Sequence, residues 1–135
     1  ELLLAEFDAT LVAAAAQAAL TEHVAAFRAV RSALLDTTVT LGRLRDGGDG
    51  ARALANAGIY LDTFGHVVVG WLWLRMAMVA ARAIEGASGG EREFYAGKLQ
   101  ACRYFFRWEL PQIQHWNQLL QSEDDTCRTM QNDFF

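Results

Sequence analysis

The sequence predicts an all-α fold, an up-and-down bundle of about four helices. Of its 135 residues 53% are hydrophobic and one is proline, a composition typical of a compact helical chain. Two glycine clusters, Gly47–Gly50 and Gly86–Gly90, separate long segments without helix breakers. Between these clusters, apolar residues recur at helical spacing in two adjoining stripes. We therefore expect the helix between the clusters to lie inside the bundle, with other helices covering both stripes.

The first segment, from Leu2 to about Arg45, is too long for one helix of a small bundle. At 1.5 Å per residue it would span roughly 65 Å. We predict a break near Leu20 and Thr21, with Thr21 as the N-cap of the second helix. The core-facing residues would be Leu4, Phe7 and Leu11 before the break and Val24, Phe27, Val30, Leu34, Leu41 and Leu44 after it.

The third predicted helix runs from about Ala51 to Ala83 or Glu85, with Asp49 as its cap. Its two stripes together cover roughly 200° of the helix surface, twice the arc of an ordinary surface helix. Because Arg75 interrupts its most apolar part, we do not expect a membrane span, which needs about 20 apolar residues. One stripe contains Tyr60, Phe64, Val67, Trp71, Leu74 and Met78; the other contains Leu61, Val68, Leu72, Met76 and Val79, with Gly58 and Gly65 on the same line.

The fourth predicted helix begins after Ser88, which forms a capping-box pattern with Glu91. Pro111 removes a backbone donor inside this helix, so we predict a bend at 108–111 and continuation to about Gln121. We divide the chain into a bundle, residues 1–121, and a tail, residues 122–135, that either docks or frays. The residues predicted to face the core are Tyr95, Leu99, Cys102, Phe106, Leu110, Ile113 and Leu120; the apolar residues of the tail are Met130, Phe134 and Phe135.

No set of residues forms a recognisable reaction centre. Asp62 and His66 are four apart, and a carboxylate beside an imidazole is one part of acid–base machinery, but no nucleophile accompanies them. A solvated pair is therefore the simpler interpretation. Arg75 and Arg82 either grip a phosphate or carboxylate or lay their stems along apolar neighbours. The Glu-x-x-His pattern of bundle metal sites is absent. We predict no catalytic, cofactor-binding or metal-binding residue in this chain.

Trp73 is the candidate interface residue, together with Asp62 and His66. The three share a polar arc of the third helix, and a tryptophan on such a face often marks a contact surface. The alternative is that a loop or the tail shields Trp73.

Charge and cysteine content limit the classes of partner and compartment. The net charge is −4 with a single lysine, which gives no electrostatic signal for nucleic acid. Cys102 and Cys127 lie in a helix and in the tail, positions that favour two free thiols in a reducing compartment. We therefore expect a protein of a reducing compartment that binds neither nucleic acid nor membrane.

Two runs carry a resemblance to a known family: NAGIYLDTFGHVVVGWLWLRMAMVA at 56–80 and FYAGKLQACRYFFRWELPQ at 94–112. They resemble the accessory C-terminal domain of acyl-CoA dehydrogenases, in the long-chain and methylmercaptopropionyl-CoA dehydrogenase-like branch. The ending CRTMQNDFF is also similar to that branch. The matching residues are Asn56, Ala57, Tyr60, Leu61, Phe64, Gly65, Gly70, Trp71, Arg75, Phe94, Lys98, Arg103, Phe105, Leu110 and Pro111.

The resemblance implies a helical domain of a larger, cytoplasmic, FAD-dependent enzyme that is a homo-oligomer. The upstream domains of the same polypeptide would bind FAD and the acyl-CoA, so this fragment alone would be inactive and hold no cofactor. Its role would be to pack against those domains or against a second subunit. The alternative is a free-standing helical module that self-associates through its apolar faces.

Overall fold

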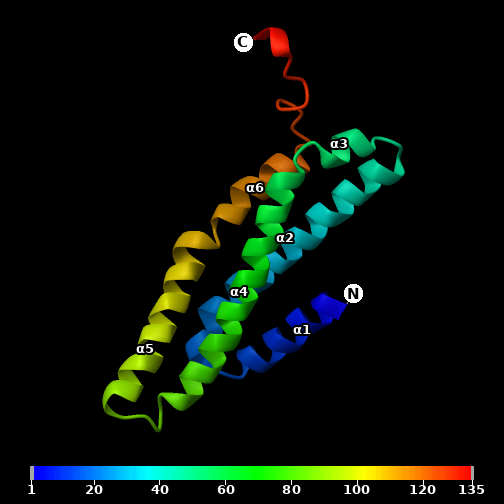
Figure 1. Cartoon of the computed structure of the whole chain (residues 1–135). Helices are drawn as coiled ribbons and strands as arrows, with labels where there is room; N and C mark the ends of the chain where they lie inside the picture. Colours follow the sequence, from blue (N-terminus) through cyan, green and yellow to red (C-terminus); the bar gives the residue numbers. More distant parts are fainter. Residues whose placement is uncertain (1, 135) are drawn as a thin grey trace.

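The computed structural model describes residues 2–134 and is helical throughout (Figure 1). The described residues contain no β-strand, so the predicted all-α class is confirmed. Helices α1, α2, α4 and the pair α5–α6 run alternately along the bundle, joined at its ends by short turns. The elements are α1 (Leu2–Ala15), η1 (Ala18–Leu20), α2 (Thr21–Asp46), α3 (Gly50–Leu54), α4 (Ala57–Ala83), α5 (Gly89–Tyr104), the π-helical turn η2 (Phe105–Glu109), α6 (Gln112–Gln121) and η3 (Asn132–Phe134).

The core lies where these helices face α4. Phe7 of α1 meets Phe27 of α2 and Trp71 of α4 edge to face, with ring centroids 5.4 and 5.5 Å apart. This geometry suits the charge distribution of aromatic rings. The indole N–H of Trp71 donates to the Thr10 hydroxyl at 2.7 Å, which ties α1 to α4. Other fully buried members of the core are Leu20, Val67, Leu74, Ala77, Cys102, Leu110 and Ile113.

The break in the first segment is confirmed, but the predicted cap is wrong. After α1 the chain forms the short turn η1, and α2 begins at Thr21 with Leu20 in the N-cap position. Thr21 is therefore already helical, and its hydroxyl donates back to the carbonyl of Ala18 at 2.9 Å. Because Thr21 lies inside the helix and not at the N-cap, α2 has no side-chain capping hydrogen bond.

The third predicted helix consists of two helices. Asp49 caps the first as predicted, accepting a hydrogen bond from the Arg52 N–H at 3.0 Å. The helix stops after Leu54, however, and α4 begins at Ala57. At the break, the Asn56 amide donates to the carbonyl of Asp124 at 2.7 Å, so the chain changes direction where the tail contacts it.

Ser88 is the residue before α5, as predicted, but the hydrogen bonds of the predicted capping box are not formed. Ser88 is the N-cap residue and has extended backbone angles, but its side chain makes no capping hydrogen bond. Gly89 follows with φ of 53°, in the left-handed region that glycine tolerates. A capping box needs a regular first turn, and this backbone angle interrupts it.

The predicted interruption near Pro111 is confirmed and is wider than expected. It begins at Phe105 as a π-helical turn, in which the Leu110 N–H donates to the Phe105 carbonyl at 2.9 Å. Pro111 then precedes α6, which ends at Gln121. Since proline has no N–H, a regular helix would have left the Arg107 carbonyl without its partner here.

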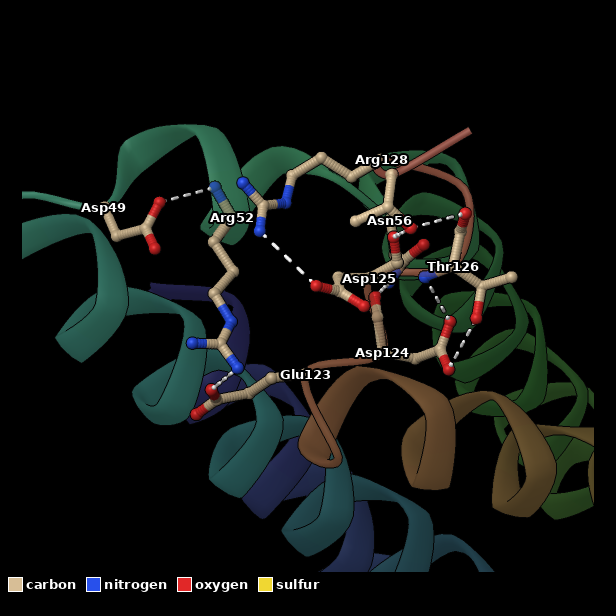
Figure 2. A network of polar contacts seen from close by, with 9 residues as sticks. Asp49, Arg52, Asn56, Glu123, Asp124, Asp125, Thr126 and Arg128 are labelled. Atoms are coloured by element: carbon tan, nitrogen blue, oxygen red, sulfur yellow. Dashed lines mark hydrogen bonds and ion pairs between the residues drawn. The ribbon is translucent and has the colours of Figure 1, made fainter. Parts of the chain in front are cut away.

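The tail is tied to the bundle at its root (Figure 2). Glu123 has φ of 56°, and the N–H groups of Glu123 and Asp124 donate to the carbonyls of Leu120 and Leu119. This is a Schellman turn with glutamate in the position that usually holds glycine. The Glu123 carboxylate pairs with Arg52 at 2.9 Å. Further along, Met130 and Phe134 are exposed, so only the root docks. The division of the chain at residue 121 stays a prediction.

Candidate interaction surface

One of the two apolar stripes of α4 is exposed, so the prediction that both are buried is wrong. On the packed side, Val67 and Leu74 are fully buried and Ala77 is 1% exposed. On the other side, Leu61 is 66% exposed and Val79 is 64% exposed. The described helices of this chain are too few to surround α4, because α1, α2, α5 and α6 all lie toward its packed side. The exposed apolar side chains of α4 are Leu61, Phe64, Val69, Leu72, Met76 and Val79.

This surface continues onto α5. A hollow of about 220 Å³ between α4 and α5 has apolar walls that include Met76, Val79 and Phe94, and Phe94 is 58% exposed. Large contiguous apolar patches of this kind mark interaction sites on soluble proteins. We call this surface the bare face and define it as Gly58, Leu61, Gly65, Leu72, Met76 and Val79 of α4 with Phe94 of α5.

Two glycines give the bare face shallow notches. A Cβ added to Gly58 or to Gly65 would meet no atom within 4 Å. Glycine inside a helix costs about 0.5–1 kcal/mol relative to alanine. The packing of this chain therefore gives no reason for glycine at these positions. Gly70 on the packed side differs, since its Cβ would lie 3.1 Å from Leu110 Cδ1.

Positive charges border the bare face. The Arg75 guanidinium lies 4.9 Å from the centroid of the Trp71 ring, and Lys98 Nζ lies 5.2 Å from that of Phe94. Arg82 is also exposed, on the last turn of α4. Within residues 2–134 none of these three cations forms an ion pair with a carboxylate. Arg75 thus makes a cation–π contact through its guanidinium, and neither of the two sequence interpretations of Arg75 is decided by this contact.

The three predicted interface residues differ in exposure. Trp73 is half-buried beside the core, and its role at an interface stays a prediction. His66 is also half-buried, with its ring 4.7 Å from Trp116 of α6 and its Nδ1 3.0 Å from the Asp62 carbonyl oxygen. Asp62 is exposed. The bare face lies on the apolar stripe beside them, where the sequence signal was present but was interpreted as core.

The nucleophilic and basic side chains near the core are poorly placed for chemistry. Cys102 and His23 line one hollow of about 300 Å³ between α2, α4 and α5. Burial raises the pKa of the Cys102 thiol to about 12, so the reactive thiolate is not populated near neutral pH. Burial also lowers the pKa of His23. In the part of the chain that the structure describes, no three His, Cys, Asp or Glu residues gather as a metal site would need.

Helix α4 also has the length and composition of a membrane span, and among the described helices it is the one that does. This corrects the expectation that Arg75 interrupts the apolar run too early. The observation is weak evidence for a membrane, because helices inside water-soluble bundles meet the same criteria.

Comparison with known proteins places the fold in a protein class. Residues 3–131 match the model of the family described as "Acetyl-CoA dehydrogenase C-terminal like". The chain therefore belongs to this family of acyl-CoA dehydrogenase C-terminal domains. The branch predicted from the sequence stays a prediction.

A curated relative supports the same assignment. The chain is 37% identical over 75 residues to the broad-specificity linear acyl-CoA dehydrogenase FadE5 of Mycobacterium tuberculosis. The aligned segment covers 55% of this chain and 11% of that relative, so the chain corresponds to a small part of the enzyme it resembles. No solved structure matches the chain.

Proposed function

We propose that this chain is the C-terminal helical domain of an FAD-dependent acyl-CoA dehydrogenase, with a structural role and no active site of its own. The parent enzyme would oxidise the Cα–Cβ bond of an acyl-CoA thioester, with FAD accepting the hydride in the upstream domains. We further propose that the parent is a cytoplasmic homo-oligomer that binds neither nucleic acid nor membrane.

The observation that carries the structural role is the exposed apolar stripe of α4. An apolar surface of this length is unfavourable in water and indicates that the chain works against another protein surface. The environments of Cys102 and His23 are consistent with this role, since burial keeps the first protonated and the second neutral. The family match supplies the kind of enzyme to which the surface would belong.

The division of labour is tested by adding FAD and an acyl-CoA separately to the isolated 135-residue chain. We expect no stoichiometric binding of either ligand by calorimetry, and no change in flavin fluorescence beyond that of a matched albumin control. Flavin bound at one equivalent by this chain alone would contradict the proposal. The same titration on the complete polypeptide should give one FAD per chain.

A further inference from the structure

We propose that the bare face of α4 docks onto the upstream catalytic part of the same polypeptide, on an apolar ridge flanked by carboxylates. This inference rests on the proposed function, because it assumes an upstream part. It goes further by naming the surface that this chain presents and the chemistry of the surface that it meets.

The size and shape of the bare face favour a protein partner. From Leu61 to Val79 the face covers 19 residues, or roughly 27 Å along the helix axis. The notches at Gly58 and Gly65 alternate with the projecting side chains of Leu61 and Leu72. Notches seven residues apart suit the interdigitation of side chains from a protein surface. Fluid lipid chains need no such complementary shape.

The charge pattern favours a partner with acidic groups. Arg75, Arg82 and Lys98 border the face, and the described carboxylates leave all three without an ion pair. Charge complementarity around an apolar centre is how interfaces gain specificity. A second copy would offer the same cations, with Asp62 at the edge of this face on α4 and Glu6 of α1 in the hollow that Arg75 and Arg82 also line. A membrane of anionic lipids would have to bind a chain whose net charge is −4.

The length of the related enzyme favours a partner in the same polypeptide. The segment aligned with FadE5 is 11% of that protein, so most of such an enzyme lies outside the region compared here. A tethered surface is present at an effective concentration in the millimolar range. An upstream ridge therefore outcompetes a free partner of equal affinity for the bare face.

Cysteine labelling on the complete polypeptide tests the proposal. Leu72→Cys is placed in a Cys127→Ser background, since Cys127 is exposed and Cys102 is buried. We expect maleimide to react with it at least about tenfold more slowly in the complete polypeptide than in the isolated chain. Val12→Cys on α1, where the native side chain is 77% exposed, is the matched control and should react equally in both. Val79→Cys repeats the test if Leu72→Cys misfolds.

Charge reversal tests the chemistry of the partner. In the complete polypeptide, Arg75→Glu should speed the labelling of Leu72→Cys severalfold by placing like charges across the interface. Arg28→Glu is the control, because Arg28 is exposed on α2 and away from the bare face. A labelling rate unchanged by Arg75→Glu would overturn the assignment of an acidic flank.

Each remaining outcome overturns the docking proposal. Equal labelling in the two proteins would mean that the face stays open, and equal protection at Val12→Cys would mean that protection is not specific to this face. Protection that grows with protein concentration would assign the face to a second copy. Protection only with phosphatidylserine–phosphatidylcholine vesicles would assign it to lipid. Flavin content of the complete polypeptide is measured on the same sample, and its absence would instead contradict the proposed function.

Discussion

Both sides of α4 are apolar, but one side is buried and the other is exposed. Leu74 is fully buried beneath α1, α2 and the α5–α6 pair, whereas Leu72, two residues earlier, is 44% exposed. Gly70 meets a leucine and two phenylalanine rings, whereas Gly65 meets open space. One helix therefore carries a side that this chain completes by itself and a side that it leaves for another surface. The pattern of hydrophobic residues predicts how much of the helix surface must be buried. It does not predict whether this chain or another molecule buries that surface.

The strongest test of this contrast compares Leu74→Ala with Leu72→Ala. We expect Leu74→Ala to lower the unfolding free energy of the isolated chain by about 3 kcal/mol, because it opens a cavity in the core. Leu72→Ala should change it by less than about 0.5 kcal/mol, as a surface substitution does. Urea denaturation followed by circular dichroism measures both. Equal losses would mean that the exposed side is already covered in the isolated chain.

The two glycines give a second, smaller contrast of opposite sign. Gly65→Ala should raise the stability of the isolated chain by up to about 1 kcal/mol, because alanine favours the helix and its Cβ has room. Gly70→Ala should lower stability by about 1 kcal/mol, because its Cβ would lie 3.1 Å from Leu110 Cδ1, closer than an ordinary contact. Melting temperatures of the two variants give the comparison. A rise in melting temperature for both substitutions would mean that the packing of α4 around Gly70 has room for a Cβ.

The smallest effect should come from His23, which lines a hollow on the packed side together with Ala77. Burial lowers the pKa of His23 in the folded chain below its usual 6.5. The unfolded chain then binds the proton more tightly, so stability is constant above about pH 6.5 and falls as the pH drops through that value. His23→Gln should lose less melting temperature than the parent chain between about pH 7 and pH 5.

Two features make the His23 result specific. His115 is exposed on α6, so His115→Gln should follow the parent chain. The neighbouring carboxylate of Glu22 titrates in a lower pH range than His23. A bidentate hydrogen bond from Arg107 at 2.8 Å lowers the Glu22 pKa from 4.5, so its contribution is lost only at lower pH. An identical pH response in all three chains would exclude His23 as the titrating group.

Signals that act within a few residues predicted the fold well. Asp49 before a helix and Pro111 inside one act on the adjacent backbone, so their effects could be inferred from sequence. The apolar stripes of α1, α2 and the α5–α6 pair likewise identified most of the core. Two cap predictions failed, because the turn η1 places the N-cap of α2 at Leu20 and because Gly89, with positive φ, follows Ser88.

Features that depend on distant residues could not be predicted in this way. The break before α4 coincides with a hydrogen bond between Asn56 and Asp124, 68 residues apart in the chain. The candidate surface was missed for a related reason. The stripe containing Leu61 and Leu72 was recognised as apolar and assigned to the core, because periodicity assumes that the cover belongs to the same chain. Trp73 was placed on a polar arc from its helical position; it is half-buried beside the core, and its interface role stays a prediction.

The left-handed turn at Glu123 has a practical consequence. It sets the direction in which the chain leaves α6. The ion pair between Glu123 and Arg52 holds that direction relative to the short helix α3. The last described residues consequently diverge from the end of the bundle (Figure 1). A dye attached to an exposed side chain of this segment, such as Met130→Cys, is therefore held away from the helices.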